Sequence, residues 1–254
     1  MSQPATIDAI KYFERINYRD EINSSIEVLT ALQHLHLLHV PFENLDIHLG
    51  RRIELSRSFD KIVNQGRGGF CYELNGTFFE LLKALGFDVK LISARVHSGD
   101  NGFGPEFDHM AIVATIQDVK YLVDVGFGEF AYSPLKIEMD VPQADRTGTF
   151  MFAHHDKDYL AIDKLQEQNF TPEYIFTETG RQMDDFIDMC NFHQTSSQSH
   201  FTQKRVCTIV TEKGRVTISG SKLKQTEGGA ISEIELANEE EFNKALWDYF
   251  KIKM

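Results

Sequence analysis

Residues 66–76 read GRGGFCYELNG, so three glycines and an arginine lie directly before Cys71. After Cys71, apolar residues recur at the spacing of one helix face: Leu74, Phe78, Leu81, Leu82 and Leu85. Gly86 is a typical residue for ending such a helix. The pattern predicts a helix over residues 71–85 with Cys71 in its first turn. At that position, backbone N–H groups lack helical partners and the helix dipole favours an anion.

This environment favours a nucleophilic role for Cys71. A helix N-terminus lowers the pKa of a thiol, and the thiolate is the reactive form. The preceding glycines permit positive φ angles and a close approach of another backbone segment or a substrate. They also leave backbone amides, first the N–H of Cys71 itself, available to an oxyanion. The other two cysteines, Cys190 and Cys207, have no such surroundings and are interpreted as small buried hydrophobes.

Residues 1–86 are predicted to be mostly helical. Apolar residues at 10, 12, 13 and 16 form one helical stripe, and Ser24 with Glu27 forms a capping-box pattern. The helix after this box is expected to run to about residue 39, because Pro41 stops it. Four histidines lack partners at metal-ligand spacing and are interpreted as surface or interface residues: His34, His36, His39 and His48.

From about residue 87 the apolar pattern changes to the short runs and period of two that are typical of strands. Strands are expected over 89–96, 109–116 and 121–127, with further strands over 150–162 and 173–177. Residues 184–193 suggest a short helix, 207–219 a hairpin turning at 213–214, and 237–250 a closing helix. The predicted class is therefore α+β: helices over 1–86, an antiparallel sheet over 87–193, and a mixed αβ end over 194–254.

Composition narrows the class of protein. The 254 residues are 42% hydrophobic and 25% charged, which is typical of a soluble globular protein, and their net charge is −12. This charge argues against nucleic acid as the main partner, although a local pocket could still bind a small anion. An apolar run long enough for a membrane span is missing from the sequence. The polar N-terminus and the sparse cysteines predict a cytoplasmic location.

A nucleophilic cysteine needs a base, and the base needs an orienting group. His109 opens the run HMAIVATI, which is followed by KYLVDVGF across Gln117 and Asp118. A hairpin turn centred between 117 and 118 pairs residues whose numbers sum to 235, and it brings Asp124 diagonally next to His109 on the same face. A carboxylate within an apolar strand needs a partner, and His109 supplies one. The expected catalytic set is therefore Cys71, His109 and Asp124.

This set indicates acyl transfer or hydrolysis through a thioester, without indicating the acyl group or its acceptor. A hydrolase or a transglutaminase-like enzyme would use the same three side chains, since such triads occur on unrelated folds. A binding module that has kept the scaffold without catalysis is a third interpretation. No metal site is predicted.

Three motifs resemble those of the arylamine N-acetyltransferase family. Residues 67–75, RGGFCYELN, resemble the family's cysteine motif, residues 41–45 read PFENL, and residues 123–128 read VDVGFG. A looser element at 194–202 follows in the family's order. The resemblance covers most of the chain. It implies a helical bundle, a β-barrel-like domain and a C-terminal αβ lid, with a cysteine-peptidase-like core.

The resemblance also implies an activity and its site residues. Acetyl-CoA is the expected acetyl donor, and arylamines or arylhydrazines are the expected acceptors. Phe42 and Phe127 are expected to line the acceptor pocket, and Gly126, Phe127 and Gly128 to lie beside the bound cofactor. The expected mechanism is ping-pong, through an acetyl-Cys71 thioester.

Arg67 and Glu73 flank the nucleophile and are expected to pair with each other.

Overall fold

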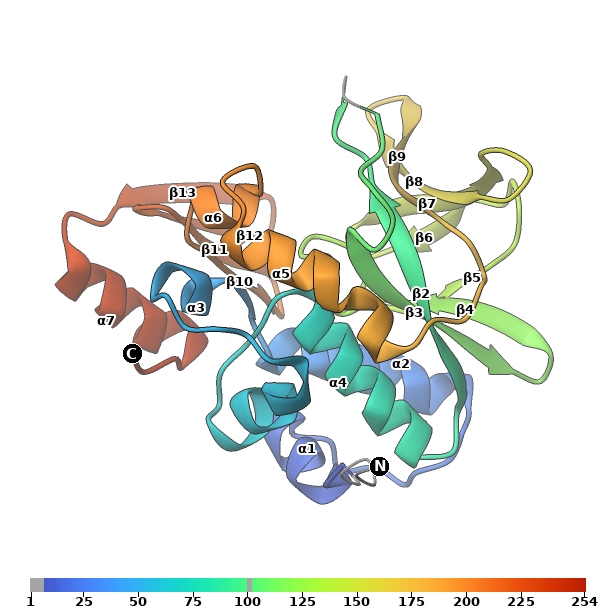
Figure 1. Cartoon of the computed structure of the whole chain (residues 1–254), viewed down its shortest axis with the longest axis horizontal. Helices are drawn as coiled ribbons and strands as arrows, with labels where there is room; N and C mark the ends of the chain where they lie inside the picture. The colour runs from blue at the N-terminus through green and yellow to red at the C-terminus, as the bar shows by residue number, and fades with distance from the viewer. Residues whose placement is uncertain (1–6, 100–101) are drawn as a thin grey trace.

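The computed structural model describes residues 7–99 and 102–254. Its N-terminal part is helical, as predicted (Figure 1). The helices are α1 (Ala9–Ile16), α2 (Ile26–His39), α3 (Leu45–His48) and α4 (Cys71–Ala84), with a 3-10 turn at Leu55–Arg57 and a π turn at Asp60–Asn64. Gly86 follows α4 with a φ of 83°, the left-handed conformation expected where a helix stops.

The central part is an eight-stranded antiparallel sheet in the order β5-β4-β3-β2-β9-β8-β7-β6. Its strands are β2 (Asp88–Val96), β3 (His109–Ile116), β4 (Val119–Val123), β5 (Leu135–Lys136), β6 (Gln143–Asp145), β7 (Gly148–His154), β8 (Leu160–Gln166) and β9 (Asn169–Phe176). A bridge between Met139 and Phe152 brings the two ends of the sheet together into a nearly closed barrel. The stretch 150–162, predicted as strand, contains two strands with a turn between them, because Asp156 accepts hydrogen bonds from the N–H groups of residues 158 and 159.

The C-terminal part is a second, five-stranded sheet packed against a helix. The elements after the barrel are α5 (Ile187–Thr195), α6 (His200–Gln203), β10 (Val206–Thr211), β11 (Gly214–Ser219), β12 (Lys222–Glu227), β13 (Ala230–Glu235) and α7 (Glu239–Phe250). The sheet also contains β1 (Phe42–Glu43), which pairs with β10 and so joins the N-terminal helices to this end of the chain. The predicted α+β class and the predicted order of helices, sheet and αβ end are confirmed.

Helix α4 lies where the three parts meet, beneath α5 and beside the barrel (Figure 1). Strand β3 is buried on both faces: Met110 and Ile112 belong to the hydrophobic core around α4, whereas Ala111 and Val113 face the barrel interior. This double burial explains why the run from 109 to 116 is almost wholly apolar. It also fixes the start of β3, and therefore His109, against the start of α4.

Two local predictions need correction. Ser25, and not Ser24, caps α2, because its side chain accepts the hydrogen bond from the N–H of Val28. His36 is fully buried and not at the surface, since α2 packs between other elements, and its ring bonds the hydroxyl of Tyr12. Burial, with Arg15 and His39 adding to it, lowers the pKa of His36 to about 3, so this side chain is neutral.

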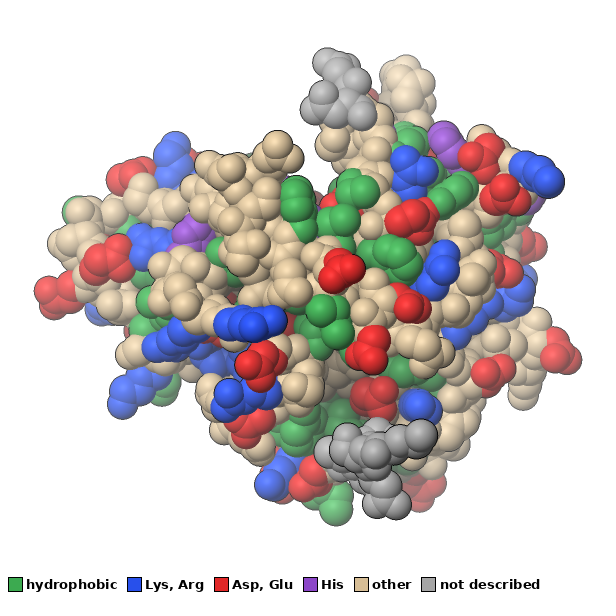
Figure 2. All heavy atoms as spheres, in the orientation of Figure 1, with side chains coloured by type: hydrophobic (Ala, Val, Ile, Leu, Met, Phe, Trp, Pro, Cys, Tyr) green, Lys and Arg blue, Asp and Glu red, His purple; other side chains and the backbone are tan. Residues whose placement is uncertain are grey.

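Surface charge, helix length and the grouping of possible metal ligands all bear on the class of protein. Figure 2 shows acidic and basic side chains interspersed over the face that it draws. Among the helices that the structure describes, none has both the length and the apolar character needed to cross a bilayer. Within residues 7–99 and 102–254, no three His, Cys, Asp or Glu side chains are grouped as a metal site requires.

Candidate active site

Cys71 is the first residue of α4 and is 3% exposed. The chain enters the helix through an extended stretch beside β1: the N–H of Glu43 donates to the carbonyl of Gly69, and Gly68 packs on Pro41. A side chain at Gly68 is excluded, since a Cβ would lie 2.0 Å from the carbonyl oxygen of Pro41. The glycines therefore serve a close approach between two backbone segments, and this approach sets where α4 begins.

His109 and Asp124 are in direct contact. Nε2 of His109 lies 2.7 Å from Oδ2 of Asp124. The hairpin has the predicted register, because Ile112 pairs with Val123, and Gln117 and Asp118 form its turn with φ angles of 50° and 64°. Asp124 follows the last residue of β4 and is 1% exposed. The contact expected from the sequence is therefore present.

Asp124 accepts four hydrogen bonds. Besides His109, the hydroxyl of Tyr174 donates to Oδ2 at 3.0 Å, while Nδ2 of Asn75 and the N–H of Gly126 donate to Oδ1 at 2.8 and 2.9 Å. Each carboxylate oxygen thus accepts two hydrogen bonds, which fix the orientation of the carboxylate. The arrangement also orients His109, because a carboxylate on Nε2 leaves Nδ1 as the ring nitrogen that can accept a proton.

Asn75 and Tyr174 are site residues that the sequence analysis did not identify. Asn75 lies one turn after Cys71 on α4, and its amide reaches Asp124, the carbonyl of Met110 and the N–H of Val125. It therefore ties the nucleophile's helix to both strands that carry the other two groups. Its place in the quoted motif ELN was the available signal. Tyr174 comes from β9, and the sequence pattern gave no sign of its contact with Asp124.

The loop Val125–Gly128 contacts both Cys71 and His109. At Gly126, a Cβ would lie 2.8 Å from Cα of Cys71 and 2.7 Å from Nδ2 of Asn75. Phe127 packs edge-on against the ring of His109, with 5.2 Å between the ring centroids. Phe42 and Gly128 line one narrow cavity together with residues of α2, β10 and β11. The structure thus places Phe42 and Gly128 at this cavity, and Phe127 beside the imidazole.

The thiol of Cys71 differs from the sequence-based expectation. Burial raises the pKa of Cys71 well above its ordinary value. The neighbouring Cys190 and the carboxylates of Asp124 and Asp108 raise it further, whereas a hydrogen bond from the backbone of Met110 lowers it. The helix N-terminus alone does not overcome this burial. A thiolate at this position therefore needs a cation beside it.

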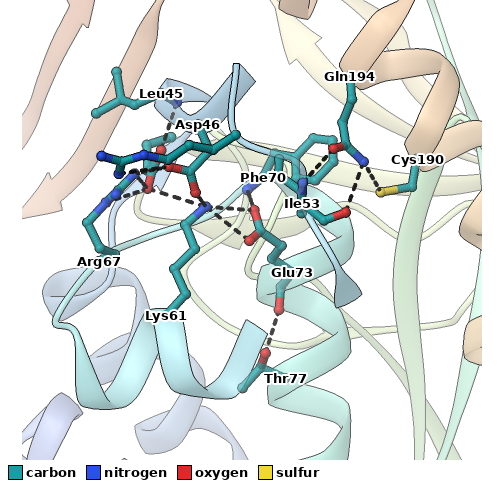
Figure 3. A network of polar contacts seen from close by, with 12 residues as sticks. Leu45, Asp46, Ile53, Lys61, Arg67, Phe70, Glu73, Thr77, Cys190 and Gln194 are labelled. Atoms are coloured by element: carbon teal, nitrogen blue, oxygen red, sulfur yellow. Dashed lines mark hydrogen bonds and ion pairs between the residues drawn. The ribbon is translucent and has the colours of Figure 1, made fainter. Parts of the chain in front are cut away.

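The predicted pair between Arg67 and Glu73 is wrong. Arg67 donates to Oε1 of Glu43 at 2.7 and 3.0 Å and to Asp46 at 3.2 Å. Glu73 instead bonds Lys61, at 3.0 and 3.1 Å, and accepts from the N–H of Phe70 at 3.2 Å (Figure 3). The reason is geometric: Glu73 points back over the start of its own helix, and the extended stretch beside β1 turns Arg67 toward Glu43.

These five side chains form a buried ionic cluster under the start of α4: Glu43, Asp46, Lys61, Arg67 and Glu73. Burial disfavours the ammonium of Lys61, but Glu73, Glu43 and Asp46 overcome this effect and raise its pKa. Three carboxylates face the two buried cations, and the exposed Arg51 approaches Asp46 from outside at 3.7 Å. Burial raises the pKa of Glu73 to about 7, although Lys61 and the N–H of Phe70 act in the opposite direction.

Comparisons with known proteins agree with this geometry. The sequence model of one family, described as N-acetyltransferase, matches residues 25–254. The arylamine N-acetyltransferase of the chicken pineal gland, isozyme NAT-10 from Gallus gallus, is 31% identical over 96% of this chain and 93% of its own length.

Solved structures give the same family. The arylamine N-acetyltransferase from M. tuberculosis is 30% identical, with a TM-score of 0.89 over 96% of this chain and 94% of that one. An arylamine N-acetyltransferase from Bacillus cereus has the same fold, with a TM-score of 0.89 at 24% identity over 97% of this chain and 99% of that one. That protein is described as having a Cys-His-Glu triad. In this chain the residue that contacts His109 is an aspartate. From its motifs, its fold and these matches, the chain belongs to the arylamine N-acetyltransferase family.

Proposed function

We propose that this protein transfers an acetyl group from acetyl-CoA to the amino nitrogen of arylamines or arylhydrazines, through an acetyl-Cys71 intermediate. The main support for the proposal is the set of hydrogen bonds that Asp124 accepts. Its carboxylate holds Nε2 of His109, and through Asn75 it is joined to the helix that begins at Cys71. This arrangement can move a proton between a thiol, an imidazole and a substrate. Membership of the family supports acetyl-CoA as the donor.

In the first half-reaction the Cys71 thiol gives its proton to Nδ1 of His109, and the sulfur attacks the thioester carbonyl of acetyl-CoA. The resulting oxyanion forms near the start of α4, where the N–H of Cys71 has no partner within the helix. When the tetrahedral species collapses, the bond to the sulfur of CoA breaks, and the CoA thiolate takes the proton from His109. Cys71 then carries the acetyl group, and CoA leaves as its thiol.

In the second half-reaction the amine attacks the acetyl-Cys71 carbonyl and passes a proton to His109. The bond between sulfur and carbonyl carbon breaks, the amide is released, and the Cys71 thiolate recovers the proton from His109. An aromatic amine is suited to this step because it is neutral and nucleophilic near pH 7. The negative charge of Asp124 stabilises the imidazolium in both halves of the cycle.

Four residues are proposed to contact the substrates. Phe127, against His109, would form one apolar wall for an aromatic acceptor, and Phe42 would form another once the cavity beside it, of about 10 Å³ in this structure, widens. Gly126, Phe127 and Gly128 would lie along the pantetheine arm of CoA where it approaches Cys71. At Gly128 the absence of a side chain keeps the backbone open to such an arm, since nothing lies within 4 Å of the place a Cβ would take. These roles are supported by position in the fold and by the family's motif at 123–128.

Two features support a cytoplasmic enzyme that needs no metal. All three cysteines are free and buried, which fits a reducing compartment. The reaction uses a side-chain base and backbone donors, so each step is complete without a Lewis acid. The proposed partners are therefore small molecules, namely CoA and the acceptor.

Initial-rate kinetics test the proposal. Acetyl-CoA and an acceptor are varied together, with a panel of anilines and hydrazides as acceptors. Parallel lines in double-reciprocal plots are expected, because CoA leaves before the acceptor reacts. Intersecting lines would show direct transfer within a ternary complex and contradict the acetyl-Cys71 intermediate. Turnover of peptide amides without turnover of arylamines would favour the hydrolase alternative.

A further inference from the structure

A row of three hydrogen-bonded side chains lies next to the catalytic residues, and the proposed mechanism does not use it. It joins Ser199, His193 and Asp108. Nδ1 of His193 lies 2.9 Å from Oγ of Ser199, and Nε2 lies 3.1 Å from Oδ1 of Asp108. His193 and Ser199 are 3% and 2% exposed. Asp108 directly precedes His109, and it belongs to the segment 99–108 that none of the family motifs explains.

Ser199 and Asp108 hold the two ring nitrogens of His193. Oγ of Ser199 lies beside Nδ1, and it also caps α6 by accepting from the N–H of Phe201 at 3.3 Å. Oδ1 of Asp108 lies beside Nε2, and its Oδ2 accepts from the N–H of Val96 at 3.4 Å. These contacts fix one orientation of the ring.

The same segment is fixed from the other side by the residue that follows Cys71. The hydroxyl of Tyr72 donates to the carbonyls of Phe107 and Asp108, at 2.7 and 3.1 Å. Phe107 has a φ of 64°, an unfavourable conformation for a phenylalanine, and its N–H is held by Ser93 at 2.7 Å. Tyr72 also lies against the ring of His193, with 6.1 Å between centroids.

We propose that His193 is a positioning residue, which acts through Asp108 and Tyr72 to hold the imidazole of His109 in line with the sulfur of Cys71. This inference rests on the proposed function, since it assumes that Cys71 must pass its proton to His109. Tyr72 follows the nucleophile, and Asp108 precedes the base, so the hydrogen bonds of the Tyr72 hydroxyl join the two backbone segments. His193 braces both residues from α5 and fixes the strained turn at Phe107.

The expected role is geometric. Without the hydrogen bond from His193, the carboxylate of Asp108 is held only by the N–H of Val96 at 3.4 Å, and the turn before β3 can relax from its positive φ. Even a shift of about 1 Å between nucleophile and base can cost about a hundred-fold in rate. The proton transfer from Cys71 would then become slower, whereas binding of acetyl-CoA would be unaffected.

The test compares the His193→Phe variant with a matched control, His36→Phe. His36 is also a fully buried histidine bonded through Nδ1 to a hydroxyl, but it lies on α2 and contacts Tyr12. For each folded variant, the alkylation rate of Cys71 by iodoacetamide is measured between about pH 6 and pH 10. The rate of Cys71 acetylation and the KM for acetyl-CoA are measured in parallel.

For His193→Phe, we expect alkylation and acetylation at pH 7 to fall at least about ten-fold, with KM unchanged. The pH profile of alkylation should move to higher pH, because the thiol is then less well paired with the imidazole. His193→Gln should recover part of the loss, since its amide can still donate to Asp108. The control should lose stability and keep its wild-type profile.

Tyr72→Phe provides a second variant in case His193→Phe does not fold. It removes one hydroxyl, keeps the ring, and should give a similar shift of the profile. A folded His193→Phe or Tyr72→Phe protein with the wild-type rate and profile would overturn the inference. If the shift is observed but acetyl-CoA does not acetylate even the wild-type Cys71, the positioning role stands and the proposed donor is wrong.

Discussion

The proton of Cys71 is the central question at the scale of single residues. Burial raises the pKa of this thiol, so at pH 7 it is protonated unless His109 accepts the proton. In His109→Ala we expect the iodoacetamide rate at pH 7 to fall at least about a hundred-fold. The rate should recover only as the pH rises above the ordinary thiol value of 9.0, since thiolate forms there without a base. An unchanged profile in this variant would show that Cys71 ionises without His109.

Gly126 gives a second prediction at this scale. In Gly126→Ala the new methyl group would collide with Cα of Cys71 and with the amide of Asn75. We expect at least about a ten-fold loss of acetyl transfer, because the collision displaces both the nucleophile and the group that supports Asp124. Gly180→Ala is the matched control, since its nearest contact is 3.7 Å, in the side chain of Lys90. Equal activity in the two variants would contradict the packing described around Cys71.

Sequence reasoning succeeded for residues whose partners are set by local structure. His109 and Asp124 were found because a two-residue turn fixes the register of one hairpin. The contacts of Asn75 and Tyr174 with Asp124 join segments about fifty positions apart, and no local pattern encodes them. The pair between Arg67 and Glu73 was wrong for the same reason, because the close approach of Gly68 to Pro41 directs Arg67 toward Glu43.

At the scale of elements, the start of α4 depends on the ionic cluster beneath it. The pKa of Glu73 is raised from its ordinary 4.5 to about 7, so the folded protein binds more protons than the unfolded chain between these values. The free energy of unfolding contributed by Glu73 is therefore greatest below pH 4.5 and falls as the pH rises to 7. Over this window the loss is on the order of 1–3 kcal/mol.

Glu73→Gln tests this dependence. Glutamine keeps the size of the side chain and the acceptor for the N–H of Phe70, but it does not titrate. Chemical denaturation at pH 5 and pH 7 should show a smaller decrease in unfolding free energy for the variant than for the wild type. A larger decrease in the variant would show that Glu73 stays ionised and that its pairing with Lys61 outweighs burial.

Helices and strands were predicted well where the same spacing of apolar residues continued over several helical turns or along a whole strand. Helix α4 was predicted within one residue at its C-terminus, because its apolar spacing, its preceding glycines and Gly86 agree. The stretch 150–162 was predicted less well, since β7 and β8 are both apolar and the turn between them depends on Asp156. His36 was interpreted as a surface or interface residue, because burial of α2 on several sides is a property of the assembled fold.

At the scale of the whole molecule, Asn44 joins the helices to the C-terminal sheet. Its amide donates to the carbonyls of Phe201 and Lys204 at 2.9 and 2.8 Å, and its oxygen accepts from the N–H of Val206 at 2.7 Å. The residue lies in the PFENL motif, where β1 enters the sheet of β10. It therefore fixes the position of the sheet that forms one wall of the cavity next to Phe42.

In Asn44→Ala we expect faster hydrogen exchange across β10 and β11 and a loss of about 2–4 kcal/mol of stability, because three buried hydrogen bonds lose one partner. The control is Asn64→Ala, whose amide bonds only the exposed Asp60. Exchange in β10 and β11 that is equal in the two variants would mean that Asn44 does not hold the sheet in place.

The central claim is that Cys71 accepts the acetyl group with His109 as its base. Mass spectrometry of the protein after incubation with acetyl-CoA alone tests it most directly, with peptide mapping to locate the label. We predict one acetyl group on Cys71 and release of free CoA in the wild type, and no label on that peptide in Cys71→Ser or within the same time in His109→Ala. An unlabelled Cys71 in a wild-type protein that still acetylates arylamines would contradict the account.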